Sequence, residues 1–282
     1  MVFKIFVSRV KTLLWAGLIG ISTVSPAFAE AGSEDGVTLR FSGATGGILR
    51  FPNTNQDKDS GNSFAEAWIK SDIELYQSND TRFKAFVLAN YVRDSKPFAY
   101  NNTQKSGVGL SLSTRVGKHL ELTFSARYDW FRELETTTER EGMRYAIDYY
   151  YYRYWPDEEG KSLWGMEKRA NVFKSYGTLE YKGSLIKGDD NVVLTVGGEY
   201  STDYAFDDSK WLFVPFVDMH FSWDVDQNNY NNKIIPAVGA KLRRPVEKGE
   251  IFVGVKLEAD YRWVDGTLDT GPMVFAGWYK GF

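Results

Sequence analysis

Hydrophobic side chains recur at every second position in several segments of roughly ten residues, the length of a strand that crosses a bilayer. In residues 120–130 the apolar positions are Leu, Leu, Phe, Ala, Tyr and Trp, with Glu, Thr, Ser, Arg and Asp between them. The same alternation occurs in residues 213–224 and 251–263. A period of two predicts β-strands that have one apolar and one polar face.

A soluble β-sandwich would also alternate, so alternation alone leaves both a sandwich and a membrane barrel open. No segment beyond the N-terminal leader approaches 18 consecutive apolar residues, which excludes a transmembrane helix there. Aromatic residues cluster at the ends of the expected strands, as in interfacial girdles, and they are Trp130, Trp211, Trp223, Trp263 and Trp278. The chain ends on Phe282, with Val274 and Trp278 at even spacing before it and Lys280 interrupting that face. These features favour the membrane barrel.

The pattern predicts about 12 antiparallel strands, within a range of 10 to 14, and an even number is what a closed bacterial barrel needs. The expected centres lie near residues 40, 70, 88, 111, 126, 148, 178, 196, 217, 239, 257 and 277. The connection over 156–170 is long, yet in this count it falls at the end of the barrel where the other expected turns are short. It is therefore either an insertion or a sign that a strand pair is miscounted. Pro215 and Pro236 are interpreted as bulges or strand starts. We find no internal repeat and no interdomain linker.

The first 29 residues have the pattern of a secretory signal peptide. Lys4, Arg9 and Lys11 precede a mostly apolar run from Leu13 to Val24, and the small-residue pattern of residues 27–29 predicts cleavage after Ala29. The alternative is a membrane anchor, for which the run is short. We therefore expect a signal peptide over 1–29 and one barrel domain over 30–282.

Composition excludes several classes of function. The formal net charge is −3, and removing the three basic residues of the leader takes it to −6, so the sequence does not predict a nucleic-acid partner. Cysteine is absent and there are only two histidines, which leaves little material for a metal site. Walker, HExxH and calcium-loop motifs are absent as well, so we expect no cofactor and no metal.

If the apolar faces contact lipid, the charged residues of the strands point into the lumen. The basic set is Arg40, Lys70, Arg82, Lys84, Arg127, Arg144, Lys174, Lys182, Lys241, Arg243, Lys256 and Arg262. The acidic set is Glu66, Asp72, Glu74, Glu121, Asp129, Asp148, Glu180, Glu199, Asp218, Asp224, Glu258 and Asp260. The two sets balance, which argues against a strongly anion-selective pore. A balanced lumen fits a wet pore for neutral polar solutes, or an ion-pair network that closes a narrow barrel.

The densest aromatic segment is the run of four tyrosines over 149–152. Alternation places Tyr150 and Tyr152 inward, beside Asp148 and Arg144. Aromatic faces next to charged hydrogen-bonding groups form a surface along which a sugar chain can slide. The alternative is a girdle combined with interior packing.

Asp218, His220 and Ser222 lie two residues apart on one strand face and contain the groups of a nucleophilic hydrolase. The His-x-Ser pair resembles the motif of outer-membrane lipid A deacylases. Those enzymes are smaller barrels whose site faces lipid, whereas these three side chains are expected to point inward. Residues two apart on a strand are also about 7 Å apart at the backbone, so Ser222 would need a favourable rotamer to reach His220.

The leader, the alternation and the terminal Phe282 together resemble small bacterial outer-membrane β-barrel proteins. The segment 126–130 (Ala-Arg-Tyr-Asp-Trp) is similar to a strand of the twelve-stranded oligosaccharide porins of enteric bacteria, although their lumen is strongly basic and this one is balanced. The last strands, from 239–245 through 277–279, resemble the barrels that end exopolysaccharide-export and phage-adsorption proteins. Both resemblances imply carbohydrate at the outer membrane.

We therefore expect a transmembrane β-barrel in the outer membrane of a Gram-negative bacterium that passively passes or exports a saccharide chain or another polar solute. Its expected partners are outer-membrane lipids, the barrel assembly machinery, which would read Phe282 and Trp278 as an assembly signal, and a saccharide solute. The expected lining residues are Arg127, Asp129, Arg144, Asp148, Tyr150, Lys241, Arg243, Asp260 and Arg262. The alternatives are a lipid or ester hydrolase that uses His220 and Ser222, and a closed structural or receptor barrel.

Overall fold

The computed structural model describes residues 31–32, 38–52, 62–97, 101–157, 159–160, 162–182, 191–206 and 209–282, so the predicted signal peptide lies outside the described residues. The long strands are β2 (Thr38–Pro52), β3 (Phe64–Ser78), β4 (Thr81–Asp94), β5 (Thr103–Val116), β6 (Leu120–Glu133), β7 (Glu139–Pro156), β9 (Met166–Lys182), β10 (Asn191–Ala205), β11 (Leu212–Asp224), β12 (Lys233–Val246), β13 (Gly249–Arg262) and β14 (Thr267–Gly281). Two short strands, β1 (Ala31–Gly32) and β8 (Ser162–Leu163), pair with the edges of β2 and β9. None of the described residues forms a helix long and apolar enough to cross a membrane.

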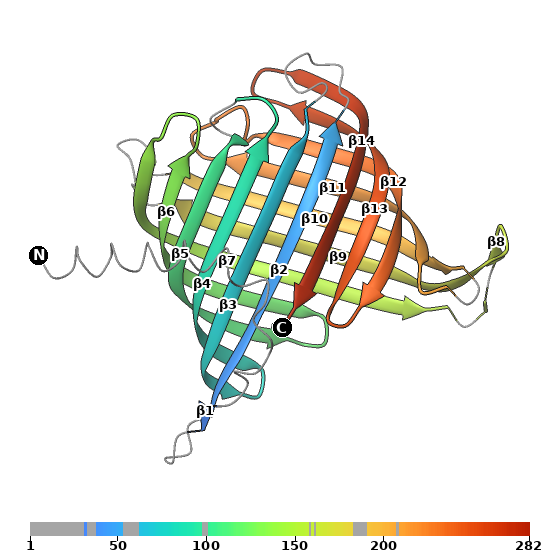
Figure 1. Ribbon diagram of the computed structural model, residues 1–282, viewed down its shortest axis with the longest axis horizontal. Coiled ribbons are helices and arrows are strands. Elements are labelled where there is room, and N and C mark those ends of the chain that lie inside the picture. Colours follow the sequence, from blue (N-terminus) through green and yellow to red (C-terminus); the bar gives the residue numbers. More distant parts are fainter. Residues whose placement is uncertain are drawn as a thin grey trace, which may run out of the picture.

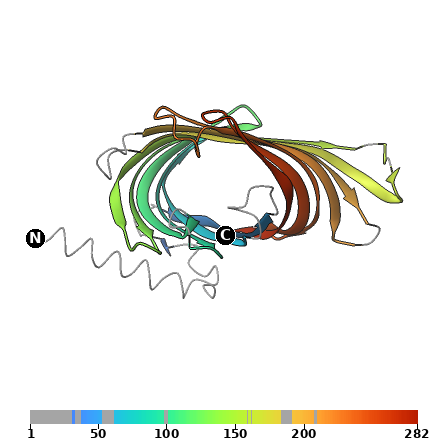
Figure 2. The same ribbon diagram turned by 90° about the horizontal axis from the view of Figure 1, so that it is seen from above.

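The twelve long strands form one closed antiparallel barrel (Figures 1 and 2). Each strand pairs with the next in sequence, and β14 returns to pair with β2 from Met273 opposite Pro52 to Gly281 opposite Ala44. The predicted number of strands is confirmed. The start of β2 and the end of β14 lie at the same end of the barrel, which we call the turn end, and the opposite end is the loop end.

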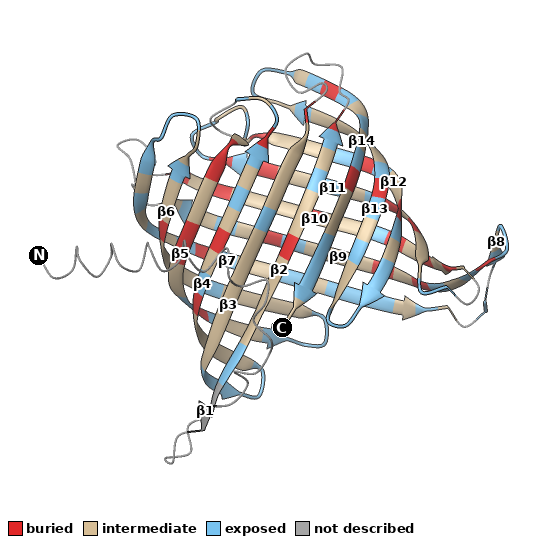
Figure 3. Ribbon diagram, in the orientation of Figure 1, coloured by how far each residue is buried: buried red, intermediate tan, exposed pale blue. Residues whose placement is uncertain are grey.

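Exposed and less exposed residues alternate along the strands (Figure 3). The exposed positions are apolar on the outer face, and Val238, Val255 and Leu257 are each half or more exposed. A continuous apolar outer surface of this kind is stable in lipid hydrocarbon, and a closed barrel is the β-structure that leaves no backbone edge unpaired there. The chain is therefore a transmembrane β-barrel.

The C-terminal residue completes the seam between β14 and β2. The Phe282 amide donates to the Gly43 carbonyl at 3.0 Å, and the Gly43 amide donates to the Phe282 carbonyl at 3.1 Å. A Cβ at Gly43 would lie 2.4 Å from the Phe282 ring, so only glycine leaves room for the ring at this point.

The long join over 156–170 is an insertion at the turn end, and the alternative of a miscounted strand pair is wrong. β7 and β9 extend past the neighbouring turn and carry the β8 hairpin, which projects from the barrel wall (Figure 2). Trp164 lies at the tip of this hairpin and is 81% exposed.

The interpretation of Pro215 and Pro236 as bulges or strand starts is wrong. Both lie inside their strands, where the β11–β12 ladder is continuous. Beside Pro215 the β10–β11 pairing is interrupted, and beside Pro236 the β12–β13 pairing is interrupted, but both resume in the same register. Each proline lacks an N–H and therefore loses a ladder hydrogen bond on one edge of its strand only. The register shifts occur elsewhere, between Glu74 and Tyr76 and between Asp203 and Tyr204.

The expectation of no internal repeat is also wrong, since β2–β7 and β9–β14 are equivalent sets of six strands. Identical residues recur 130 positions apart at Phe83 and Phe213, Phe86 and Phe216, Val87 and Val217, Asp94 and Asp224, Asn101 and Asn231, Asn102 and Asn232, Gly109 and Gly239, and Leu112 and Leu242. Their contacts recur too. Phe86 pairs with Gly109 and Phe216 with Gly239, and a Cβ at either glycine would lie 2.7 Å from its phenylalanine ring.

Equivalent hydrogen bonds also hold two loops at the loop end. Asn102 Oδ1 accepts from the Asp94 amide at 3.0 Å, and Asn101 Nδ2 donates to the Asp94 carboxylate at 2.8 Å. In the second half the corresponding bonds link Asp224 with Asn232 and Asn231, at 3.2 and 2.6 Å. The separation changes from 130 to 129 residues in other strands, for example at Glu121 and Glu250, which hides the repeat from direct inspection.

This equivalence predicts that a circularly permuted chain folds. The β7–β9 connection occupies the place that corresponds to the gap between β14 and β2, so joining Phe282 to Thr38 through a flexible linker and opening the chain at Gly160 preserves all twelve ladders. We expect a barrel with the heat-modifiable electrophoretic mobility of the parent. A permutant opened inside the β4–β5 loop, where Asp94 and Asn102 bond, is the control and should refold less well. Refolding of the control alone would contradict the equivalence.

Candidate functional site

A five-residue charge cluster lies on the inner wall of β5, β6, β7 and β9. The Asp129 carboxylate forms ion pairs with Arg144 Nε at 2.9 Å, Arg127 Nε at 3.0 Å and Lys105 Nζ at 3.4 Å. Arg127 also bonds to Glu180, which lies two strands away on β9. A pair that skips a strand can form only on the concave face, so these side chains point into the lumen. Asp129 itself is fully buried among the cations.

Further ion pairs form elsewhere in the lumen. The pairs join Arg50 to Glu66, Lys70 and Lys84 to Asp72, Lys241 to Glu199, Arg243 to Asp203 and Glu250, Lys256 to Asp218 and Glu258, and Lys233 and Arg262 to Asp260. Two cations lie over equivalent buried rings, Lys70 over Phe86 at 4.6 Å and Lys241 over Phe216 at 5.0 Å. Pairing and stacking compensate charges that the barrel interior partly desolvates.

The structure places all nine expected lining residues on inward-facing positions, but their access to water differs. Asp129 and Lys241 are buried in ion pairs, at 0% and 9% exposure. Arg127, Arg144, Arg243, Asp260 and Arg262 are partly covered and paired, and Asp148 accepts a hydrogen bond from Thr178 at 2.6 Å. Tyr150 is the most open of the nine, at 49%.

Tyrosines line the open part of the lumen. Tyr150 pairs with Tyr176 across the β7–β9 ladder, and Tyr176 is 52% exposed. Tyr152 and Tyr154 point inward from the same strand and are also exposed. Since inward-facing rings can be exposed only where open space lies in front of them, the lumen is open along β7 and β9.

Sequence reasoning missed several lumen residues. Five of them are charged: the cations Arg50, Lys105 and Lys233 and the anions Asp203 and Glu250. With three cations and two anions added, the positive and negative charges of the lumen remain nearly equal in number. Trp68 and Tyr279 also point inward and their rings are 6.0 Å apart. Strict alternation could have predicted that Tyr279 points inward, because its neighbour Trp278 is on the outer face. It could also have predicted that Trp68 points inward, because the inward residues Glu66 and Lys70 lie two positions to either side of it.

Asp218, His220 and Ser222 share the inner face of β11 but do not form a relay. No described hydrogen bond joins His220 to either neighbour, and Asp218 instead pairs with Lys256 Nζ at 3.7 Å. Ser222 is buried. In the described part of the chain, no group of three or more His, Asp or Glu side chains is placed to hold a metal ion.

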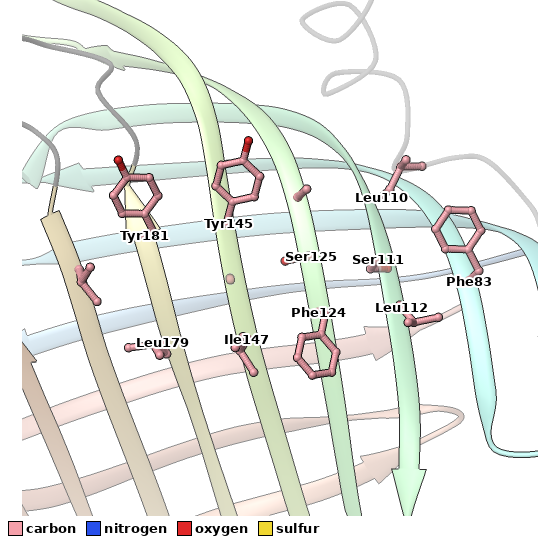
Figure 4. A pocket seen from close by; sticks show the side chains of 13 residues that line it. Phe83, Leu110, Ser111, Leu112, Phe124, Ser125, Tyr145, Ile147, Leu179 and Tyr181 are labelled. Carbon is pink, nitrogen blue, oxygen red and sulfur yellow. The ribbon is translucent and has the colours of Figure 1, made fainter.

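The outer wall carries an apolar groove of about 570 Å³ across β4–β7, β9 and β10. It is lined by outward side chains that include Phe124, Ile147 and Leu179 (Figure 4), and Ser111, Ser125 and Ala146 also border it. This groove faces lipid, on the side of the wall opposite the charges and exposed tyrosines, so the lumen wall is the candidate site.

Neither a known family profile nor a curated protein sequence matches this chain. Solved structures of outer-membrane barrels are similar in fold. The β domain of the Bordetella autotransporter BrkA is 10% identical with a TM-score of 0.43, over 86% of this chain and 98% of that chain. The KdgM porin is 7% identical with a TM-score of 0.39, over 85% and 99%. An outer-membrane channel from Pseudomonas putida F1 is 12% identical with a TM-score of 0.42, over 92% and 100%.

Removal of the Asp129 carboxylate is expected to destabilise the barrel strongly. In Asp129→Ala, the guanidinium groups of Arg127 and Arg144 lose a fully buried partner, which we expect to lower the free energy of unfolding by about 3–5 kcal/mol. Urea unfolding in liposomes measures this loss. The control is Glu258→Ala at the equivalent position of the second half, where the carboxylate pairs with Lys256 alone instead of with three cations, so the loss should be smaller. Equal losses would show that burial of Asp129 does not set the energy.

Proposed function

We propose that this protein is a passive outer-membrane channel for a polar solute, and that a saccharide chain is the solute its wall suits best. The observation that carries the proposal is the half-exposed state of the inward Tyr150 and Tyr176 rings. They border open space inside a barrel in which many of the charges are paired, so the accessible wall offers aromatic faces and hydroxyl groups.

The chemistry of this wall supports a solute of low charge. The lumen ion pairs leave no large excess of either sign, so the wall lacks the ring of like charges that selects strongly among ions. Sugar rings present apolar C–H faces that stack on aromatic rings, and hydroxyl edges that bond to Asp, Glu and Tyr oxygens. Passage along such a wall exchanges one set of hydrogen bonds for the next.

Conductance of the refolded protein in a planar bilayer tests the channel. We expect steady conductance and swelling of loaded liposomes in neutral oligosaccharides, because the space beside Tyr150 is open. Tyr150→Ala should raise the conductance, whereas Tyr200→Ala, which removes an equally exposed tyrosine from the lipid face of β10, should leave it unchanged. A correctly folded but silent barrel would contradict the proposal and favour a closed barrel.

Phe282 and Trp278 are proposed as the signal read by the barrel assembly machinery, with the turn end towards the periplasm. In Phe282→Ala we expect severalfold less barrel in the outer membrane of producing cells, because the terminal aromatic is lost. Phe282→Trp keeps an aromatic ring and should assemble like the parent. Normal cellular assembly of Phe282→Ala would contradict the signal, and an equal defect on refolding into liposomes would assign the residue to closure of the seam alone.

A further inference from the structure

The geometry points to two equivalent sugar-ring subsites that face each other across the lumen, one built by each half of the repeat. Each subsite is a row of five residues that pair with one another in register across five consecutive strands. Row A consists of Glu121, Tyr150, Tyr176, Gly197 and His220, from β6, β7, β9, β10 and β11. Row B consists of Glu250, Tyr279, Gly46, Trp68 and Asn90, from β13, β14, β2, β3 and β4. This inference rests on the proposed function and names the part of the lumen that binds the solute.

The two rows match position by position. Each begins with a glutamate, continues with a tyrosine 129 residues from its counterpart, and ends with a side chain that has a hydrogen-bonding nitrogen. The two central positions of each row hold one glycine and one large aromatic residue in opposite order. Both rows therefore hold a carboxylate and a phenol at matching positions, and a second ring at one of the two central positions.

The glycines determine how the second ring of each row lies. A Cβ at Gly197 would be 2.5 Å from the Tyr176 ring, and a Cβ at Gly46 would be 2.8 Å from the Trp68 ring. Each ring therefore lies flat over the backbone of the neighbouring strand, where any other residue would push it into the lumen. A ring that lies against the wall presents its face to the solute.

The rows approach each other from opposite walls. Five strands separate β7 from β14 in either direction around the twelve-stranded barrel, which places them on opposite sides of it. Both Tyr150 and Tyr279 are exposed to the lumen, at 49% and 43%.

A sugar ring is the solute that matches these groups. The faces of Tyr150 and Tyr279 can stack on its C–H faces, while the carboxylates of Glu121 and Glu250 accept hydrogen bonds from its hydroxyl groups. Because one row faces the other, a chain passing between them contacts an aromatic residue on both sides. A flexible polyether of similar size has no ring face to stack and is expected not to reside there.

Transient block of single-channel current by maltohexaose tests the subsites. We expect Tyr150→Ala and Tyr279→Ala to weaken the block by similar factors, each about two- to tenfold, since each removes one stacking ring. Tyr150→Phe and Tyr279→Phe keep the rings and should retain most of the block. Polyethylene glycol of matched size should give no comparable blocking events with the parent.

Tyr154→Ala is the matched control. Tyr154 points inward from β7 and is about as exposed as Tyr150, but it pairs with Val172 across the β7–β9 ladder, so it belongs to neither row. Block that is unchanged in both row variants, or lowered equally by Tyr154→Ala, would overturn the subsites. A parent that conducts without being blocked by maltohexaose would also overturn them but leave the channel standing, whereas a silent parent would overturn the channel itself. Heat-modifiable mobility confirms that each variant is folded.

Discussion

The hydrogen bonds between β14 and β2 are the interaction on which the rest of this structure depends. In hydrocarbon an unpaired backbone amide or carbonyl costs several kcal/mol, so an open twelve-stranded sheet could not persist in a bilayer. The ladder from Met273 to Gly281 closes the sheet, and the Phe282–Gly43 pair extends that closure to the last residue. Closure also defines an inside and an outside, from which the two chemistries of the wall follow.

Inside the closed wall, charge must be compensated locally. Lipid covers the apolar face, and the polar faces of all twelve strands are brought into one narrow lumen, where ion pairs form between neighbouring strands and across them. Arg127 on β6 reaches Glu180 on β9, and Lys241 on β12 reaches Glu199 on β10. These pairs brace the wall and withdraw most charges from the solvent, which leaves tyrosines as the accessible surface.

The repeat gives the wall a twofold character. Two sets of six strands place equivalent residues on opposite sides of one lumen, and the β7–β9 insertion is the link that joins them. A single six-stranded set would have open edges and could not close, whereas two sets complete each other's edges. The same arrangement places Tyr150 and Tyr279 on opposite sides of the lumen, as a consequence of how the barrel closes.

The sequence by itself predicted the barrel class from alternation together with the aromatic residues at the strand ends, and it predicted about twelve strands and the face of their residues, because a period of two is a local property of the chain. It placed Tyr150 and Arg127 inward without any knowledge of their neighbours. Only the tertiary structure decided which inward residues are buried and which are open. Alternation places both Asp129 and Tyr150 on the inner face of the wall. Asp129 is enclosed by Lys105, Arg127 and Arg144, whereas the Tyr150 ring is half-exposed to the lumen. Those differences arise from contacts between strands, whose register and closure bring distant residues together, and no local pattern encodes them.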